Sequence, residues 1–184
     1  MNRSASATPR EIAIPVSLFE SLRNELEAQT GTLPTIHALH HAGYHAGLTA
    51  AAAVDQEAGG TSFSLGQAEF WNHLSGYFTK RGWGRLGHSS PHPAVGMLRS
   101  FDWAEARTHE TDPDASCSFS AGFLSGLLSQ LAGAPIAVLE VACRSRGDTS
   151  CDFAFGSETA IHVLYGRLVD GADLEHALGA LDSR

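Results

Sequence analysis

The spacing of apolar residues changes near Gly82, and this change limits the folds open to the chain more than any other feature. Up to Lys80, the apolar residues recur at the spacing of one face of an α-helix. Beyond Gly82, several short segments show the alternation of a β-strand or form apolar runs of strand length. The sequence therefore predicts helices first and a mixture of strands and helices afterwards.

The boundaries of these segments follow from capping residues, glycines and turn residues. Helices are predicted over 17–29, 34–57, 64–80, 118–131, 158–169 and 173–181, and strands over 83–89, 95–101, 135–143 and 151–155. After a leader at residues 1–10 that is predicted to be disordered, we expect residues 11–184 to form a single α+β domain. In this domain, the N-terminal helices pack on an antiparallel sheet of two hairpins.

Charge and cysteine usage narrow the functional classes. The 184 residues include 12 Lys and Arg against 20 Asp and Glu, a net charge of −8, and the basic residues are scattered. Direct nucleic-acid binding is therefore not expected, since it needs clustered positive charge. The three cysteines cannot all pair with one another, which favours a reducing cytoplasm. No apolar run reaches membrane-spanning length, and no export signal is expected.

Catalytic motifs are not found in the sequence. There is no nucleophile elbow, P-loop or dinucleotide-binding fingerprint. Gly122 and Gly126 lie inside a predicted helix, where they indicate close helix packing. An enzyme is therefore the less favoured functional class.

The strongest chemical signal is a set of three thiols and one carboxylate: Cys117, Glu140, Cys143 and Cys151. The predicted hairpin brings Cys143 and Cys151 together, and Glu140 is the only acidic residue in an apolar strand. Three thiolates and a carboxylate make a closed tetrahedral set that suits zinc. Two alternatives stay open from spacing alone, namely three ordinary buried thiols or a Cys143–Cys151 disulfide.

Two stretches around these residues resemble a known family. The sequences CSFSAGFLSG from Cys117 and EVACRSRGDTSCDF from Glu140 closely resemble the C-terminal signature of the 4-vinyl-reductase domain. SFDWAEA from Ser100 is similar to the central strand of that family, so the resemblance covers about residues 64–156. The family includes the aromatic-sensing domains of phenol- and toluene-responsive transcription activators, and it shares its fold with small subunits of the TRAPP vesicle-tethering complex.

The resemblance implies a metal, a ligand and partners. In the phenol sensors, zinc is held by a Cys, a Glu and two further Cys in this order, which implies one structural Zn²⁺ on Cys117, Glu140, Cys143 and Cys151. It also implies a pocket for a hydrophobic or aromatic molecule, hydrocarbons included, and a homodimer. Because the DNA-binding and ATPase modules of those activators are not found here, a sensor or carrier of this kind would act through a separate regulatory protein.

Two other functions remain open from the same resemblance. The family name, and members near bacteriochlorophyll synthesis, suggest an accessory or reductase-like protein of tetrapyrrole biosynthesis. The tethering subunits suggest a non-catalytic protein-interaction module.

Candidate ligand-binding residues come from the histidines and aromatic residues. His37, His41 and His45 share one face of the second predicted helix, where they could contact a ligand or simply form a polar surface. Aromatic residues gather in the middle of the chain, where they could line a pocket or pack in the core. The predicted ligand-binding residues are His37, His41, Trp71, Trp83, Phe101 and Trp103.

Overall fold

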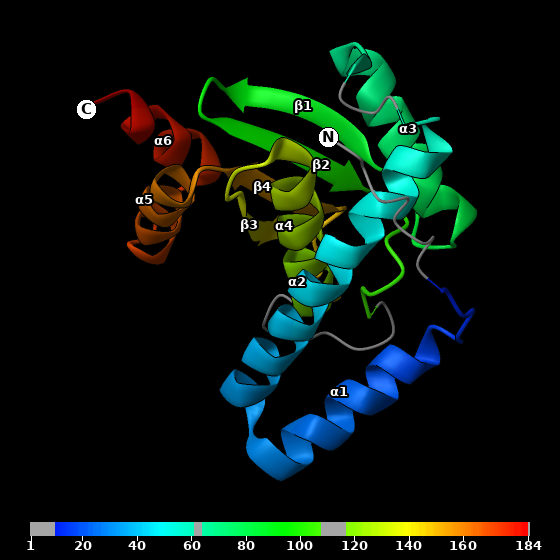
Figure 1. Cartoon of the computed structure of the whole chain (residues 1–184). Helices are drawn as coiled ribbons and strands as arrows, with labels where there is room; N and C mark the ends of the chain where they lie inside the picture. Colours follow the sequence, from blue (N-terminus) through cyan, green and yellow to red (C-terminus); the bar gives the residue numbers. More distant parts are fainter. Residues whose placement is uncertain (1–9, 61–63, 108–116, 184) are drawn as a thin grey trace.

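A computed structural model describes residues 10–60, 64–107 and 117–183. The predicted leader, except for Arg10, lies outside this range. Three helices come first in the chain, as predicted: α1 (Ser17–Thr30), α2 (Thr32–Glu57) and α3 (Gln67–Lys80). Gly31, with φ of 88°, joins α1 to α2 at a sharp corner, so that α1 runs away from the sheet (Figure 1). This φ lies in the left-handed region that favours glycine.

The four strands form one antiparallel sheet. They are β1 (Gly87–His92), β2 (Val95–Ser100), β3 (Ala137–Ala142) and β4 (Cys151–Gly156). Their order in the sheet is β1-β2-β4-β3, so two hairpins lie side by side and pair through β2 and β4. The predicted mixture of helices and an antiparallel sheet of two hairpins is confirmed.

The first strand differs from its prediction. We expected it over 83–89, followed by a turn over 89–93, but β1 runs from Gly87 to His92 and contains Pro91. Proline is tolerated there because β1 is an edge strand, where one side of the backbone needs no partner. Gly82 and Gly84 have positive φ values, so the chain turns where the strand was expected to begin.

Helices cover both faces of the sheet (Figure 1). On one face, Leu98 and Phe153 join a core with residues of α2, α3 and α4 (Ser118–Ala132). On the other face, Met97 and Ala154 pack with residues of α5 (Glu158–Val169) and α6 (Leu174–Gly179). Alternate residues of each strand thus enter different cores.

Helices α2 and α4 approach each other along four glycines. A Cβ atom on Gly43 or Gly47 would lie 2.1 Å from a carbonyl oxygen of α4. A Cβ on Gly122 or Gly126 would lie 2.0 or 2.1 Å from a carbonyl oxygen of α2. The close helix packing predicted for Gly122 and Gly126 is present in the structure.

No helix among the described residues has the length and apolar character that crossing a bilayer requires.

Candidate metal and ligand sites

The thiols and the carboxylate singled out in the sequence come together at one end of the sheet. Cys117 is the N-cap of α4, and Glu140 lies on β3. Cys143 follows the end of β3, and Cys151 is the first residue of β4. One ligand atom from each of these four residues lies within 4.8 Å of all the others. We call these four residues the cysteine cluster.

The distances in the cysteine cluster suit a metal ion. Cys117 Sγ lies 3.9 Å from Cys143 Sγ and 3.8 Å from Cys151 Sγ, and all three cysteines are free. A disulfide needs a separation of about 2.05 Å. The backbone N–H of Cys117 donates to Glu140 Oε2 at 3.0 Å, but the buried Oε1 atom has no hydrogen-bond partner among the described residues. Such an unsatisfied carboxylate oxygen is costly unless a cation binds it.

Electrostatics in the cysteine cluster lead to the same conclusion. Contacts with the Cys143 and Cys151 thiols, and then burial, raise the pKa of the Cys117 thiol well above its ordinary value. Burial raises the pKa of the Glu140 carboxyl well above its usual range. A divalent cation would lower both pKa values because it stabilises thiolate and carboxylate charge.

The connection between β3 and β4 is held by an aspartate that the sequence reasoning missed. Asp148 Oδ2 accepts a hydrogen bond from the backbone N–H of Cys143 at 2.8 Å and pairs with Arg146 Nη2 at 2.8 Å. Gly147, with φ of 96°, allows the tight turn between them. Asp148 therefore positions Cys143 through the backbone.

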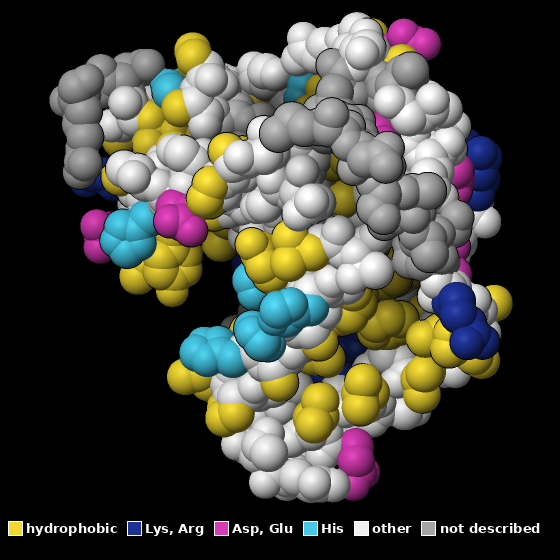
Figure 2. Space-filling model, viewed as in Figure 1, with side chains coloured by type: hydrophobic (Ala, Val, Ile, Leu, Met, Phe, Trp, Pro, Cys, Tyr) yellow, Lys and Arg dark blue, Asp and Glu magenta, His cyan; other side chains and the backbone are white. Residues whose placement is uncertain are grey.

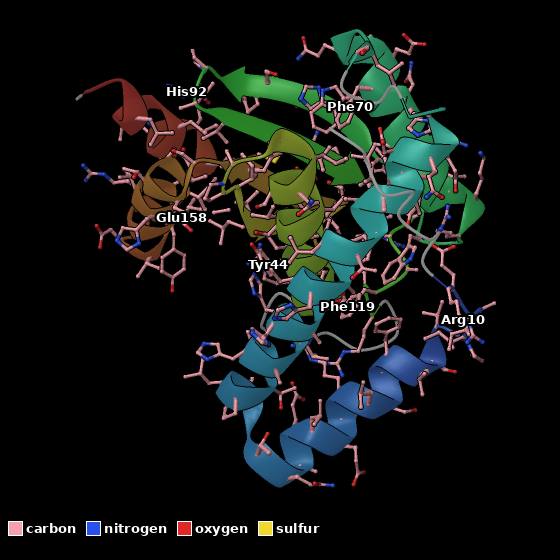
Figure 3. All side chains as sticks on the ribbon, viewed as in Figure 1. Arg10, Tyr44, Phe70, His92, Phe119 and Glu158 are labelled. Carbon is pink, nitrogen blue, oxygen red and sulfur yellow. The ribbon has the colours of Figure 1, made fainter. Side chains whose placement is uncertain are left out.

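A cavity of about 730 Å³ lies between the N-terminal segment, α1, α2 and the start of α4. Phe119 and Arg10, both labelled in Figure 3, are among the residues that line it. Its aromatic walls are Phe19, Tyr77, Trp83, Phe119 and Phe123. The rings of Trp83 and Phe119 are stacked, with centroids 5.9 Å apart and an angle of 4° between planes. We call this cavity the apolar pocket.

One wall of the apolar pocket is the extended segment at residues 10–16, which we call the N-terminal strap. Arg81 Nε donates to both carboxylate oxygens of Glu11, at 2.9 and 3.0 Å, and Tyr77 Oη donates to Glu11 at 3.2 Å. The Arg81 guanidinium also pairs with Glu57 at 2.7 Å and lies 3.7 Å from the centre of the Tyr77 ring. Glu11 therefore fastens the strap to the body of the protein.

Glu105 connects the apolar pocket to the start of α4. It lines the pocket and accepts hydrogen bonds from the backbone N–H groups of Phe119 and Ser120, at 3.0 and 2.7 Å, and from the Ser120 hydroxyl. An anion is favourable at a helix N-terminus, yet burial raises the pKa of Glu105 to about 7. The carboxyl group thus fixes the turn of α4 that begins at Cys117.

The predicted ligand-binding residues do not form one site. Of these six residues, all of them described, only Trp83 lines the apolar pocket. Trp71 is stacked on His88 at 4.0 Å and lines a separate surface groove of about 570 Å³. The placement of the other residues differs, and Trp103 is buried in the core, where its Nε1 atom donates to Ser120 Oγ at 2.8 Å.

Phe101, His37 and His41 lie at the surface. Phe101 is 66% exposed, and both histidines lie on the exposed side of α2. The sequence reasoning missed Phe19, Glu11 and Glu105. The apolar alternation of Ile12, Ile14 and Val16 was the signal that could have placed the strap against a pocket.

Comparison with known proteins identifies one segment of the chain. Residues 99–157 match the family model of the vinyl-4-reductase domain. This segment carries the signature of that domain. It includes all four residues of the cysteine cluster, so the resemblance to the 4-vinyl-reductase family predicted from the sequence is confirmed. No curated protein matches the chain by sequence.

Solved structures related to the vinyl-4-reductase domain share the fold. The phenol-responsive sensory domain of the transcription activator PoxR, solved with phenol, matches with a TM-score of 0.69 and 19% identity, over 80% of this chain and 77% of that one. A vinyl-4-reductase family protein from Methanocaldococcus jannaschii matches with a TM-score of 0.52 and 16% identity, over 79% and 83% of the two chains.

A third solved structure is a trafficking protein particle complex subunit 3 from Naegleria fowleri, covalently bound to palmitic acid. It matches with a TM-score of 0.64 and 10% identity, over 77% of this chain and 91% of that one. The predicted likeness to both the vinyl-4-reductase and the TRAPP small-subunit folds is therefore confirmed at the level of the fold.

Proposed function

We propose that the chain is a sensor or carrier domain that binds a hydrophobic or aromatic small molecule in the apolar pocket. The observation that carries the proposal is the pocket itself, whose volume of about 730 Å³ lies within the range of ligand sites and whose walls are largely aromatic. The match to the vinyl-4-reductase domain and the fold shared with a phenol-responsive sensory domain support it. Tyr77, Arg81 and Glu105 supply the few polar groups that would orient a ligand.

We further propose that the cysteine cluster holds one structural zinc ion. With zinc–sulfur bonds of about 2.3 Å, two thiolates on a tetrahedral ion are separated by roughly 3.8 Å. The Sγ separations of 3.8 and 3.9 Å agree with this value. Three thiolates and Glu140 leave no open position for an activated water, so the ion would supply a cross-link rather than catalysis.

In this proposal, the metal ion positions one wall of the apolar pocket. It would bind the start of α4, at Cys117, to the β3–β4 hairpin. Phe119 and Phe123 follow Cys117 on the same helix and line the pocket. The hydrogen bonds of Glu105 to Phe119 and Ser120 hold the same helical turn from the pocket side.

We also propose a homodimer that acts through a separate regulatory protein in the cytoplasm. Helix α1 supports the dimer, because Leu18 and Leu22 are 47% and 46% exposed and Leu33, just past its end, is 63% exposed. Apolar side chains gathered on one helix are typical of an interface. Light scattering after size exclusion would give twice the chain mass for a dimer.

A thermal-shift panel tests the ligand proposal. Phenols, alkylbenzenes, fatty acids and porphyrins are compared, since a ligand at 100 times its Kd stabilises the folded state by about 2.7 kcal/mol. We expect a phenol or an alkylbenzene to raise the melting temperature of the wild type, and Phe123→Ala, which removes a pocket wall, to abolish the shift. Phe101→Ala, outside the pocket, is the matched control and should keep it.

Each other outcome of the panel contradicts the proposal in a defined way. A shift with porphyrins alone would favour a role in tetrapyrrole biosynthesis. No shift with any compound would favour a non-catalytic interaction module. An equal shift in the Phe123→Ala variant would place the ligand outside the apolar pocket.

A further inference from the structure

The histidine-bearing face of α2 lies apart from both sites described above. Four histidines fall between positions 37 and 45, and none of them lines the apolar pocket or belongs to the cysteine cluster. His37, His41 and His45 follow one another at four-residue intervals, so they share one face of the helix, and all three are exposed. Figure 2 shows histidine side chains gathered in a patch over α2.

His41 and His45 converge on each other. Their Nε2 atoms lie 3.3 Å apart, and their ring centroids are separated by 4.6 Å with an angle of 78° between planes. Metal–imidazole bonds are about 2.0–2.1 Å long, so two imidazole nitrogens on one ion are separated by roughly 2.9–3.4 Å, depending on the angle at the metal. The observed separation lies in this range, and the backbone of α2 already maintains it.

The chemistry of this face selects a class of ion. Burial, and then the neighbouring His37 and His41, lower the pKa of His40, since protonated rings on adjacent positions repel each other. Crowded imidazoles are therefore held in the neutral form, which is the form that binds metals. Nitrogen donors suit Cu²⁺, Ni²⁺ and Zn²⁺, whereas Mg²⁺ and Ca²⁺ prefer oxygen.

We propose that His41 and His45 chelate one divalent transition-metal ion of this class, with water in the remaining positions. The ion would exchange with solvent, because both rings are exposed. The cysteine cluster, in contrast, is closed and buried. This site does not depend on the ligand proposal, so either can fail without the other.

Isothermal titration of Ni²⁺ into the zinc-loaded, dialysed full chain tests this site. We expect one Ni²⁺ per chain, and at least tenfold weaker binding in His41→Gln and in His45→Gln. The double variant should bind no more weakly than either single variant, because each substitution alone removes the chelate. Far-UV circular dichroism on each variant separates loss of binding from loss of folding.

Two matched controls make the test specific. His162→Gln, at an exposed position on α5, and His37→Gln, on the same face of α2, should both bind Ni²⁺ as the wild type does. Wild-type affinity in His41→Gln or His45→Gln would overturn the proposal. A loss in His37→Gln or His162→Gln as large as that in His45→Gln would overturn it as well.

Discussion

Cys117 connects the chemistry of the two candidate sites at the scale of single residues. Its thiol lies in the cysteine cluster, and its N–H holds Glu140 Oε2. Two residues further on, Phe119 lines the apolar pocket and donates its N–H to Glu105. A change in one site therefore has only a single helical turn to cross before it reaches the other.

The Cys143→Ser variant is expected to lose its zinc ion and to unfold at a lower temperature. Cys143 is fully buried, and binding of a structural metal is coupled to folding, so we expect the free energy of unfolding to fall by about 3 kcal/mol or more. Native mass spectrometry would report zinc per chain, and circular dichroism the melting temperature. Thr149→Ser, exposed in the same connection, is the control and should keep one zinc. A stable Cys143→Ser variant, or a wild type without metal, would contradict the structural role.

Glu105 is expected to make the stability of the protein depend on pH. Its pKa is about 7 in the folded protein, against an ordinary value of 4.5, because burial disfavours the ionised form. A raised pKa means that the folded state holds the proton more tightly, so this stabilisation is complete below about pH 4.5 and is lost as pH rises through about 7. The full loss corresponds to roughly 3 kcal/mol.

Urea unfolding of the wild type and of Glu105→Gln at about pH 5 and about pH 8 isolates this contribution. The wild type should lose more stability between the two pH values than Glu105→Gln, which cannot ionise. Glu20→Gln, at an exposed position on α1, should follow the wild type. Parallel behaviour of wild type and Glu105→Gln would show that Glu105 does not titrate in this range.

At the scale of elements, the contact between α2 and α4 organises the protein. The two helices meet backbone against backbone along Gly43, Gly47, Gly122 and Gly126. Helix α2 supplies Ala46, Thr49 and Ala50 to the apolar pocket, and α4 supplies Phe119 and Phe123. The pocket therefore depends on how closely these helices approach.

Gly47→Ala is expected to destabilise the protein. The added Cβ would lie 2.1 Å from the carbonyl oxygen of Phe123, so the helices must separate, at a cost of about 1–3 kcal/mol or more. Gly76→Ala is the matched control, because it lies inside α3 with nothing within 4 Å of the added atom. It should gain up to about 1 kcal/mol, since alanine favours the helix over glycine. Urea unfolding measures both, and a Gly47→Ala variant as stable as the wild type would contradict the packing.

For the whole molecule, the sequence predicts local elements well. It predicts helix α5 with the bounds that the helix has, and β2 to within one residue, because caps and alternation act over a few positions. The cysteine cluster is predictable for a similar reason, since Glu140 stands alone in an apolar strand next to Cys143. The hairpin between β3 and β4 then brings in Cys151.

The apolar pocket could not be predicted in the same way. Its walls come from the N-terminal strap, α1, α2, the end of α3 and the start of α4. These segments meet only because α1 turns back at Gly31 and Glu11 reaches Arg81 across the chain. No local pattern encodes such a meeting, and for the same reason aromatic character alone did not separate Trp83 from the core residue Trp103.

The glycine contact between α2 and α4 has a mechanical consequence. Where backbones touch, no side chain can rotate to absorb a displacement, so the two helices move as one rigid body. The pocket surfaces on α2 and α4 then keep a constant spacing. Any expansion around a bound molecule must come from the N-terminal strap and from Trp83, which lie outside that pair. The molecule is thus divided into a stiff half and a compliant half, and the compliant half faces the ligand.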